Sequence, residues 1–219
     1  LDLPDPAAGR LLARLADAHL IERLMAARFT FHDLFRDYAR ARAADVDGPA
    51  DCSSALPRLY DHYLHQADAA ARRLYPTILR LPLPGGPRGE FTDHESAFGW
   101  LTSEQHNLIS AALRAQDLGL DHMAWLFADA TRVFFWLTRN SVEWPAVAAA
   151  AVAAARRCGG LRERAIALFS LGVAHMCSAG YRASIQDYLE ALPLVREAGW
   201  ADAEAACLAN LGVLHLELG

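Results

Sequence analysis

The sequence predicts an all-α protein that carries one small β-hairpin and ends in a solenoid of repeated helical pairs. Nearly every segment spaces its apolar residues as a helix does, and only two short stretches alternate like strands. Glycines 119, 159 and 199 recur at a constant interval of 40 residues. The chain has 219 residues, 53% of them apolar and 21% charged, which suffices to bury a core.

The first 44 residues predict a helix, a hairpin and a second helix. Leu11, Leu12 and Leu15 form a short apolar stripe after Pro4 and Pro6. Residues 19–22 and 28–31 alternate like strands and flank a short connection, which predicts the hairpin. A further apolar stripe has the i, i+3, i+4, i+7 spacing of a helix that docks on a core. It consists of Phe31, Leu34, Phe35 and Tyr38.

The middle of the chain predicts two more amphipathic helices, within 56–67 and 97–112. Residues 44–54 are polar and contain Gly48 and Pro49, so a linker is expected there. Residues 81–89 are rich in proline and glycine, which predicts a loop between domains or subdomains. Residues 123–137 are apolar on nearly all sides, as in a helix enclosed by its neighbours. These features divide the chain into residues 1–44, 45–118 and 119–219.

The carboxy-terminal third repeats itself. Six residues recur 40 positions later with identical types: Ala165, Leu168, Leu171, Gly172, Val173 and His175. We expect Gly172 to omit a side chain where the partner helix approaches. A helical pair of this kind cannot bury its own apolar face, so neighbouring pairs must stack on it. The last helix, within residues 201–218, has no partner, which predicts self-association through it or a poorly ordered terminus.

Composition excludes several function classes. The net charge of −5 gives no general attraction to nucleic acid or anionic membranes. All 21 basic residues are arginine, so the lysines of phosphate-binding loops, Schiff bases and kinases are missing. No signal peptide is evident, and the longest apolar run, at 145–155, is too short to span a bilayer. The cysteines share no CxxC spacing, which favours buried free thiols and a reducing cytoplasm. They are Cys52, Cys158, Cys177 and Cys207.

No catalytic or metal site is expected, and the chain is predicted not to be an enzyme. His62 and His65 could bind a metal from one helical face, but their place beside a packed stripe favours surface histidines. Two acidic pairs are better explained as solvated faces than as acid–base groups. These pairs are Asp33 with Asp37 and Glu95 with Glu104. A GxSxG motif is also absent from the sequence.

The repeated segment resembles a tetratricopeptide repeat, in the longer form found in bacterial regulators. The resemblance rests on the order of small, apolar and aromatic residues in one unit: Leu168, Leu171, Gly172, His175, Tyr181, Ile185, Tyr188, Ala191 and Leu192. His175 and His215 stand where the family usually has an aromatic residue. We expect both histidines at the edge of the core; the alternative is that they line a concave groove and contact a partner.

A second resemblance lies near the amino terminus. Phe31-His32-Asp33, followed by Leu34, Arg36 and Ala39, resembles the hydrophobic-His-Asp motif that ends the winged-helix domain of STAND/NB-ARC signalling ATPases. Residues 15–22 and 97–112 are similar to SARP-type bacterial transcription regulators. Together these segments resemble a SARP-type STAND regulator. The resemblance implies three parts in order: a partial winged helix over residues 1–44, a helical linking bundle and tetratricopeptide repeats.

The resemblance implies a nucleotide-dependent switch. In that family the motif's histidine contacts the β-phosphate of ADP and holds the closed, inactive state. This role passes to His32, with Asp33 bracing the local structure; the alternative is a purely structural histidine that caps a helix. The phosphate-binding loop with its lysine would lie upstream. ADP or ATP is therefore expected only in the intact protein, and this chain alone is expected to bind nucleotide weakly and not to hydrolyse it.

The expected function is that of a cytoplasmic sensor and scaffold. The repeats would bind a protein partner or ligand, or fold back on the protein's own nucleotide-binding domain, and so control the switch. Direct contact with DNA or membrane is not expected. The alternative is a free-standing tetratricopeptide adaptor that binds a peptide of another protein.

Overall fold

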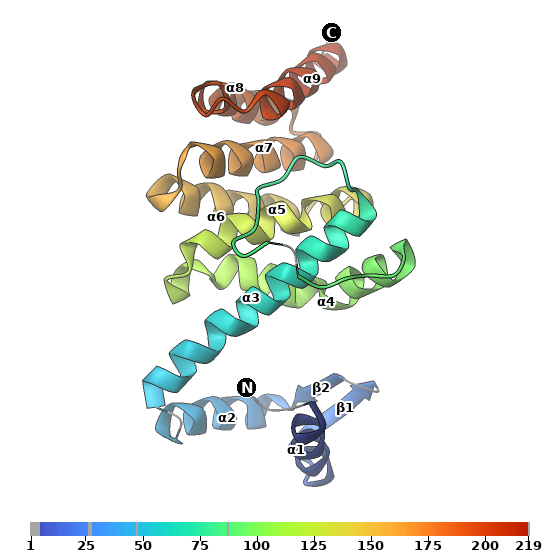
Figure 1. Cartoon of the computed structure of the whole chain (residues 1–219), viewed down its shortest axis with the longest axis vertical. Helices are drawn as coiled ribbons and strands as arrows, with labels where there is room; N and C mark the ends of the chain where they lie inside the picture. Colours follow the sequence, from blue (N-terminus) through green and yellow to red (C-terminus); the bar gives the residue numbers. More distant parts are fainter. Residues whose placement is uncertain (1–4, 26–27, 47, 87, 219) are drawn as a thin grey trace. The chain divides into compact units, whose positions relative to one another are not determined.

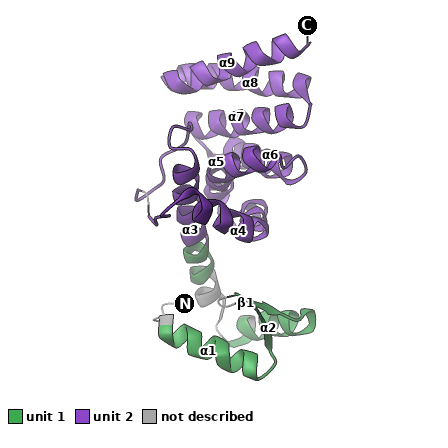
Figure 2. Cartoon of the chain, turned by 90° about the vertical axis from the view of Figure 1, so that its right-hand side faces the viewer, with its two compact units in different colours: residues 1–59 green, residues 60–219 purple. Residues whose placement is uncertain are grey.

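The computed structural model describes residues 5–25, 28–46, 48–86 and 88–218. It confirms an all-α fold with a small β-hairpin and repeated helical pairs. The chain divides into two compact units, residues 1–59 (unit 1) and residues 60–219 (unit 2), which Figure 2 colours green and purple. Each unit is described by itself.

Unit 1 contains the expected hairpin between two helices. Helix α1 (Asp5–Asp17) leads into strands β1 (Ile21–Met25) and β2 (Arg28–Phe31), and helix α2 (Asp33–Val46) follows (Figure 1). The strands are antiparallel, with Ile21 opposite Phe31 and Arg23 opposite Phe29. The register shifts after Arg23, as in a β-bulge.

The apolar stripe of α2 is exposed. Leu34 is 87% exposed and Tyr38 is 62% exposed. The expectation that this stripe docks on a core is therefore not met among the described residues. Helical spacing establishes that a helix has an apolar face, but it does not supply the surface that covers this face.

The linker expected at residues 44–54 is wrong, because two helices nearly meet there. Helix α2 ends at Val46 and helix α3 (Gly48–Leu74) begins two residues later. Pro49 falls in the first turn of α3. Backbone N–H groups there have no acceptor within the helix, so a proline at this position costs no hydrogen bond. Glycine and proline at this position therefore start a helix.

Unit 2 is a stack of antiparallel helices. It contains the end of α3, then α4 (His94–Arg114) and a short 3₁₀ helix, η1 (Gln116–Leu118). The stack continues with α5 (Asp121–Thr138), α6 (Glu143–Cys158), α7 (Leu161–Cys177), α8 (Tyr181–Glu197) and α9 (Ala201–Leu218). Consecutive helices from α5 to α9 pack on one another, and α5 also contacts α7 (Figures 1 and 2). This packing gives the stacked layers that the repeat predicts.

Helix α5 lies at the centre of the core. Its residues from Met123 to Phe135 are buried, whereas Trp136 and Leu137 at its end are exposed. Trp144 of α6 is completely buried, and its ring lies 6.1 Å from that of Phe135. The enclosed helix expected at residues 123–137 is thus confirmed over most of its length.

Gly172 makes room for the partner helix, as predicted. A Cβ atom on Gly172 would lie 2.9 Å from the Tyr188 ring of α8. The Ser184 hydroxyl donates a hydrogen bond to the Gly172 carbonyl over 2.7 Å. The Tyr188 hydroxyl accepts a hydrogen bond of 2.9 Å from Asn210, so these contacts tie α7, α8 and α9 together.

The loop expected at residues 81–89 is confirmed, but it lies inside unit 2 and does not separate domains. It belongs to a longer irregular segment, residues 75–93, which connects α3 to α4 and runs across α5 and α7 (Figure 1). Leu81 and Leu83 of this segment are buried. Among the described residues, no helix has both the length and the apolar character needed to cross a bilayer.

Candidate partner-binding groove

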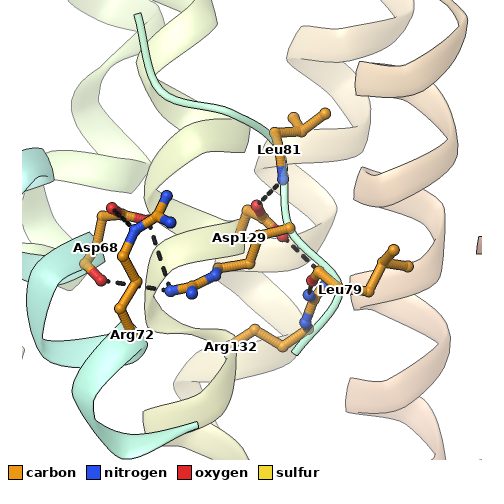
Figure 3. A network of polar contacts seen from close by, with 7 residues as sticks. Asp68, Arg72, Leu79, Leu81, Asp129 and Arg132 are labelled. Atoms are coloured by element: carbon orange, nitrogen blue, oxygen red, sulfur yellow. Dashed lines mark hydrogen bonds and ion pairs between the residues drawn. The ribbon is translucent and has the colours of Figure 1, made fainter. Parts of the chain in front are cut away.

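Residues 75–84, which we call the strap, are held against the solenoid through their backbone. The Leu81 N–H donates a hydrogen bond of 2.8 Å to the Asp129 carboxylate. Arg132 donates a hydrogen bond to the Leu79 carbonyl. Asp129 and Arg132 lie one turn apart on α5, so a single helix presents both an acceptor and a donor to the strap (Figure 3).

A buried network of charges supports these two contacts (Figure 3). Arg132 lies 3.1 Å from Asp129, and Asp68 of α3 lies 2.6 Å from Arg72 and 3.6 Å from Arg80. Burial raises the pKa of Asp129, and the neighbouring Arg132 opposes this rise. Burial likewise lowers the pKa of Arg80, against the effect of Asp68. Buried charges persist only when they are paired, so the network fixes the geometry of the contacts to the strap.

An apolar hollow of about 270 Å³, the inner groove, opens beside the strap. It lies among the strap and the first helix of three successive pairs, α5, α7 and α9. Its lining residues are Tyr75, Ile78, Leu79, Arg132, Val133, Trp136, Phe169, Val173, Met176, Ala206 and Asn210. Sites with mainly apolar and aromatic walls and a few polar groups are typical of ligand and peptide binding.

The polar and aromatic groups of the groove are held in place. The Arg132 guanidinium lies 5.2 Å from the centre of the Phe169 ring, at the distance of a cation–π contact. Tyr75 and Trp136 meet edge to face with their ring centres 6.3 Å apart. Met176 adds a side chain that adapts to irregular ligands. The groove can therefore receive an apolar side chain from a partner.

His175 and His215 do not line this groove. The structure places His175 at the contact between α7 and α8, where its Nδ1 lies 2.6 Å from the Asp187 carboxylate. Burial raises the pKa of Asp187, and the bond from His175 opposes this rise. His215 is exposed on α9. The structure thus does not bring the two histidines together in one site.

His32 lies between β2 and α2, at the start of the helix. Its carbonyl accepts a hydrogen bond of 3.0 Å from the Arg36 N–H, and its side chain is exposed. The side chain borders an open hollow of about 520 Å³ whose other lining residues are Ala13, Ala16, Asp17, His19, Ile21, Glu22 and Arg23. Asp33 is the first residue of α2 and lies 3.3 Å from Arg36. An imidazole at a helix start is well placed to contact an anion.

The expectation of two surface histidines in α3 is wrong for His65. His62 is exposed, but His65 is only 3% exposed, and its Nε2 lies 3.3 Å from Asp61. The buried face of α3 is broader than its apolar stripe because it also takes in His65 and Asp68. Across the part of the chain that the structure describes, no group of three or more His, Cys, Asp or Glu residues could hold a metal ion.

The cysteines differ in exposure, contrary to the expectation that all are buried. Cys207 is buried, Cys177 is partly buried and Cys158 is exposed. All three are free thiols. The side chain of Cys52 lies outside the described residues.

The contacts of Asp129 and Arg132 with the strap were not predicted from the sequence. Asp129 and Arg132 are charged residues inside an otherwise apolar helix, and this is the signal that could have identified them. Their partners are backbone groups of a distant loop, which no residue pattern reveals.

Comparison with known proteins finds similarity to bacterial regulators. The chain is 29% identical to the regulatory protein AfsR of Streptomyces griseus over 223 aligned positions, which cover 99% of this chain and 23% of that protein. It is 35% identical to the regulatory protein AfsR of Streptomyces coelicolor over 120 positions, which cover 50% of this chain and 12% of that protein. The chain thus spans less than a quarter of the length of these relatives. No family model and no solved structure matches. Both similarities support the resemblance to SARP-type regulators.

Proposed function

We propose that this chain is the sensor region of a SARP-type transcription regulator and that its repeats, of the tetratricopeptide kind, bind a partner through the inner groove. The observation that carries the proposal is the groove itself, an apolar hollow to which the first helices of three successive pairs all contribute. Its partner is a protein segment, supplied by another protein or by the regulator's own nucleotide-binding domain. The net charge of −5 does not favour a direct contact with DNA.

The second part of the proposal is that partner binding biases a nucleotide switch. ADP or ATP binds in an ATPase domain upstream of this chain in the intact protein, and His32 contributes a contact to the ADP phosphate that stabilises the inactive state. Support comes from the exposure of His32 at the start of α2, where the helix dipole favours an anion. Asp33 braces this turn through Arg36.

The similarity to AfsR favours this proposal over a free-standing adaptor. An adaptor needs only the repeats of unit 2, whereas the aligned positions cover 99% of the chain and therefore include unit 1. Under this proposal the chain has no catalytic residue of its own.

The test uses the intact regulator in a promoter–reporter assay. Trp136 lines the inner groove, whereas Leu137, the next residue of α5, is similarly exposed and lies outside it. We expect Trp136→Ala to change reporter output at least several-fold, because it removes a large aromatic side chain from the groove lining. We expect Leu137→Ala to behave like the unmodified protein. Equal outputs from both variants, at equal protein levels, would contradict the proposal.

A further inference from the structure

The strap occupies the inner face of the solenoid in the manner of a bound peptide. The described residues 75–86 and 88–93 form no helix or strand, and the segment crosses helices that belong to the repeats. Within the strap, Leu81 and Leu83 are buried while Pro82 and Pro84 are exposed. This alternation is that of an extended segment with one side against a surface.

Besides contacts to side chains of the strap, unit 2 binds groups of the strap that every peptide carries. Asp129 accepts the backbone N–H of Leu81, and Arg132 donates to the backbone carbonyl of Leu79. Contacts to the backbone groups of an extended segment do not depend on which side chains that segment carries. Specificity then comes from the alternating leucines, which fill apolar space.

Open space flanks the strap on the inner face. The inner groove lies along one part of it, and a second hollow of about 590 Å³ lies between residues 77–80 of the strap and the start of α9. The strap thus fills this face only in part. The strap is followed by Gly85 and Gly86, which both have a φ of +76°. Glycine adopts this left-handed conformation without strain, so a glycine turn ends the strap.

We infer that the inner face of the solenoid is a receptor for extended, leucine-rich segments, and that the strap is its built-in occupant, which a partner segment displaces. The partner segment carries leucines at alternate positions, with a basic residue and then prolines between them, like residues 79–84. This inference rests on the proposed function and names its partner class. Displacement breaks no helix or strand, and the prolines keep a competing segment extended before it binds.

The test measures binding of a fluorescent peptide with the sequence of residues 76–84 by anisotropy. In one variant of the chain, residues 78–84 are replaced by glycine and serine at equal length, which removes the buried leucines and so weakens the hold of the strap on the receptor. The variant is expected to bind the peptide at least about tenfold more tightly than the unmodified chain, where the tethered strap competes at a high effective concentration.

A matched pair of peptides tests recognition of the backbone. Methylation of the nitrogen that corresponds to Leu81 removes the donor to Asp129, and we expect it to weaken binding about tenfold. Methylation at Thr77, which is exposed, is expected to leave binding unchanged. Equal binding of all three peptides, or no binding by a folded variant, overturns the inference.

A second measurement uses the unmodified chain and does not depend on the folding of the variant. Amide hydrogen exchange at Leu81 is expected to accelerate when excess peptide displaces the strap. An unchanged exchange rate at millimolar peptide overturns the inference. If the exchange rate does not change but Trp136→Ala still alters reporter output, the inference fails and the proposed function stands. If the peptide binds but Trp136→Ala leaves the reporter unaltered, only the proposed function is contradicted.

Discussion

Two glycines at the same position of the repeat have different surroundings. A Cβ atom on Gly172 would meet the Tyr188 ring at 2.9 Å, whereas a Cβ atom on Gly212 would find no atom within 4 Å. Gly172 is needed because α8 covers α7 closely. On α9 the equivalent surface has no covering helix in the described chain, so Gly212 meets no such restriction.

We predict opposite effects on stability for the two glycines. Gly172→Ala is expected to destabilise unit 2 by about 1–3 kcal/mol, because the added methyl group would push against Tyr188. Gly212→Ala is expected to stabilise α9 by up to about 1 kcal/mol, because alanine favours a helix and the space is open. Urea unfolding followed by circular dichroism measures both variants. Destabilisation by both would show that α9 is covered.

The thiols are predicted to react in the order of their exposure. Burial raises the pKa of Cys207 to about 11 and also raises that of Cys177. A raised pKa favours the protonated thiol in the folded state, so this contribution to stability is present below the unfolded pKa and lost as the pH rises through the folded value. Among the three thiols that the structure describes, iodoacetamide labelling at pH 8 should modify Cys158 first and Cys207 last. Rapid labelling of Cys207 in the folded chain would contradict this order.

At the scale of single residues, the sequence predicted roles that depend on the helical repeat. Gly172 could be predicted because its spacing placed it on the face that meets the next helix. His65 and Cys158 could not, since burial depends on how broad a face the neighbouring elements cover. Asp129 and Arg132 were missed because they bind backbone groups of a loop far away in sequence.

Among the elements of unit 2, α9 packs less completely than its repeat equivalent α7. Leu168 of α7 is 3% exposed, but its repeat equivalent Leu208 is 48% exposed. Val173 is 9% exposed and its equivalent Val213 is 49% exposed. The apolar surface that neighbouring elements cover on α7 is thus open to solvent on α9.

We predict that the isolated chain self-associates through α9. Multi-angle light scattering over a range of concentrations should show a mass above that of the monomer. Val213→Arg should reduce association because it places a charge on the open face, whereas Leu113→Arg on α4, at a similarly exposed position, should not. A monomer at every concentration would count against this prediction.

The element boundaries show where a sequence pattern suffices. Helix α4 follows from the spacing of its apolar stripe, α5 from its nearly continuous apolar sequence, and α7 and α8 from the repeat. The linker expected at residues 44–54 failed because glycine and proline also begin helices, as they do in α3. The loop at residues 81–89 was placed correctly, but its burial within unit 2 depends on a network to which α3 and α5 both contribute.

At the scale of the whole molecule, the two units carry different candidate sites. Unit 1 carries His32 beside an open hollow, and unit 2 carries the inner groove and the strap. We predict that the isolated chain does not bind ADP tightly, because the sequence has no phosphate-binding lysine. Isothermal calorimetry that gives a Kd of about 1 mM or tighter would contradict this prediction.

The most direct measurement is a double-mutant cycle on the rate of ADP release from the intact regulator. The account predicts that His32→Ala speeds release, that Trp136→Ala changes the rate although it touches no nucleotide, and that the two effects are not additive because both act on one equilibrium. Leu137→Ala serves as the matched control. A rate for Trp136→Ala equal to that of the unmodified protein, or strictly additive effects, would contradict the coupling of the groove to the switch.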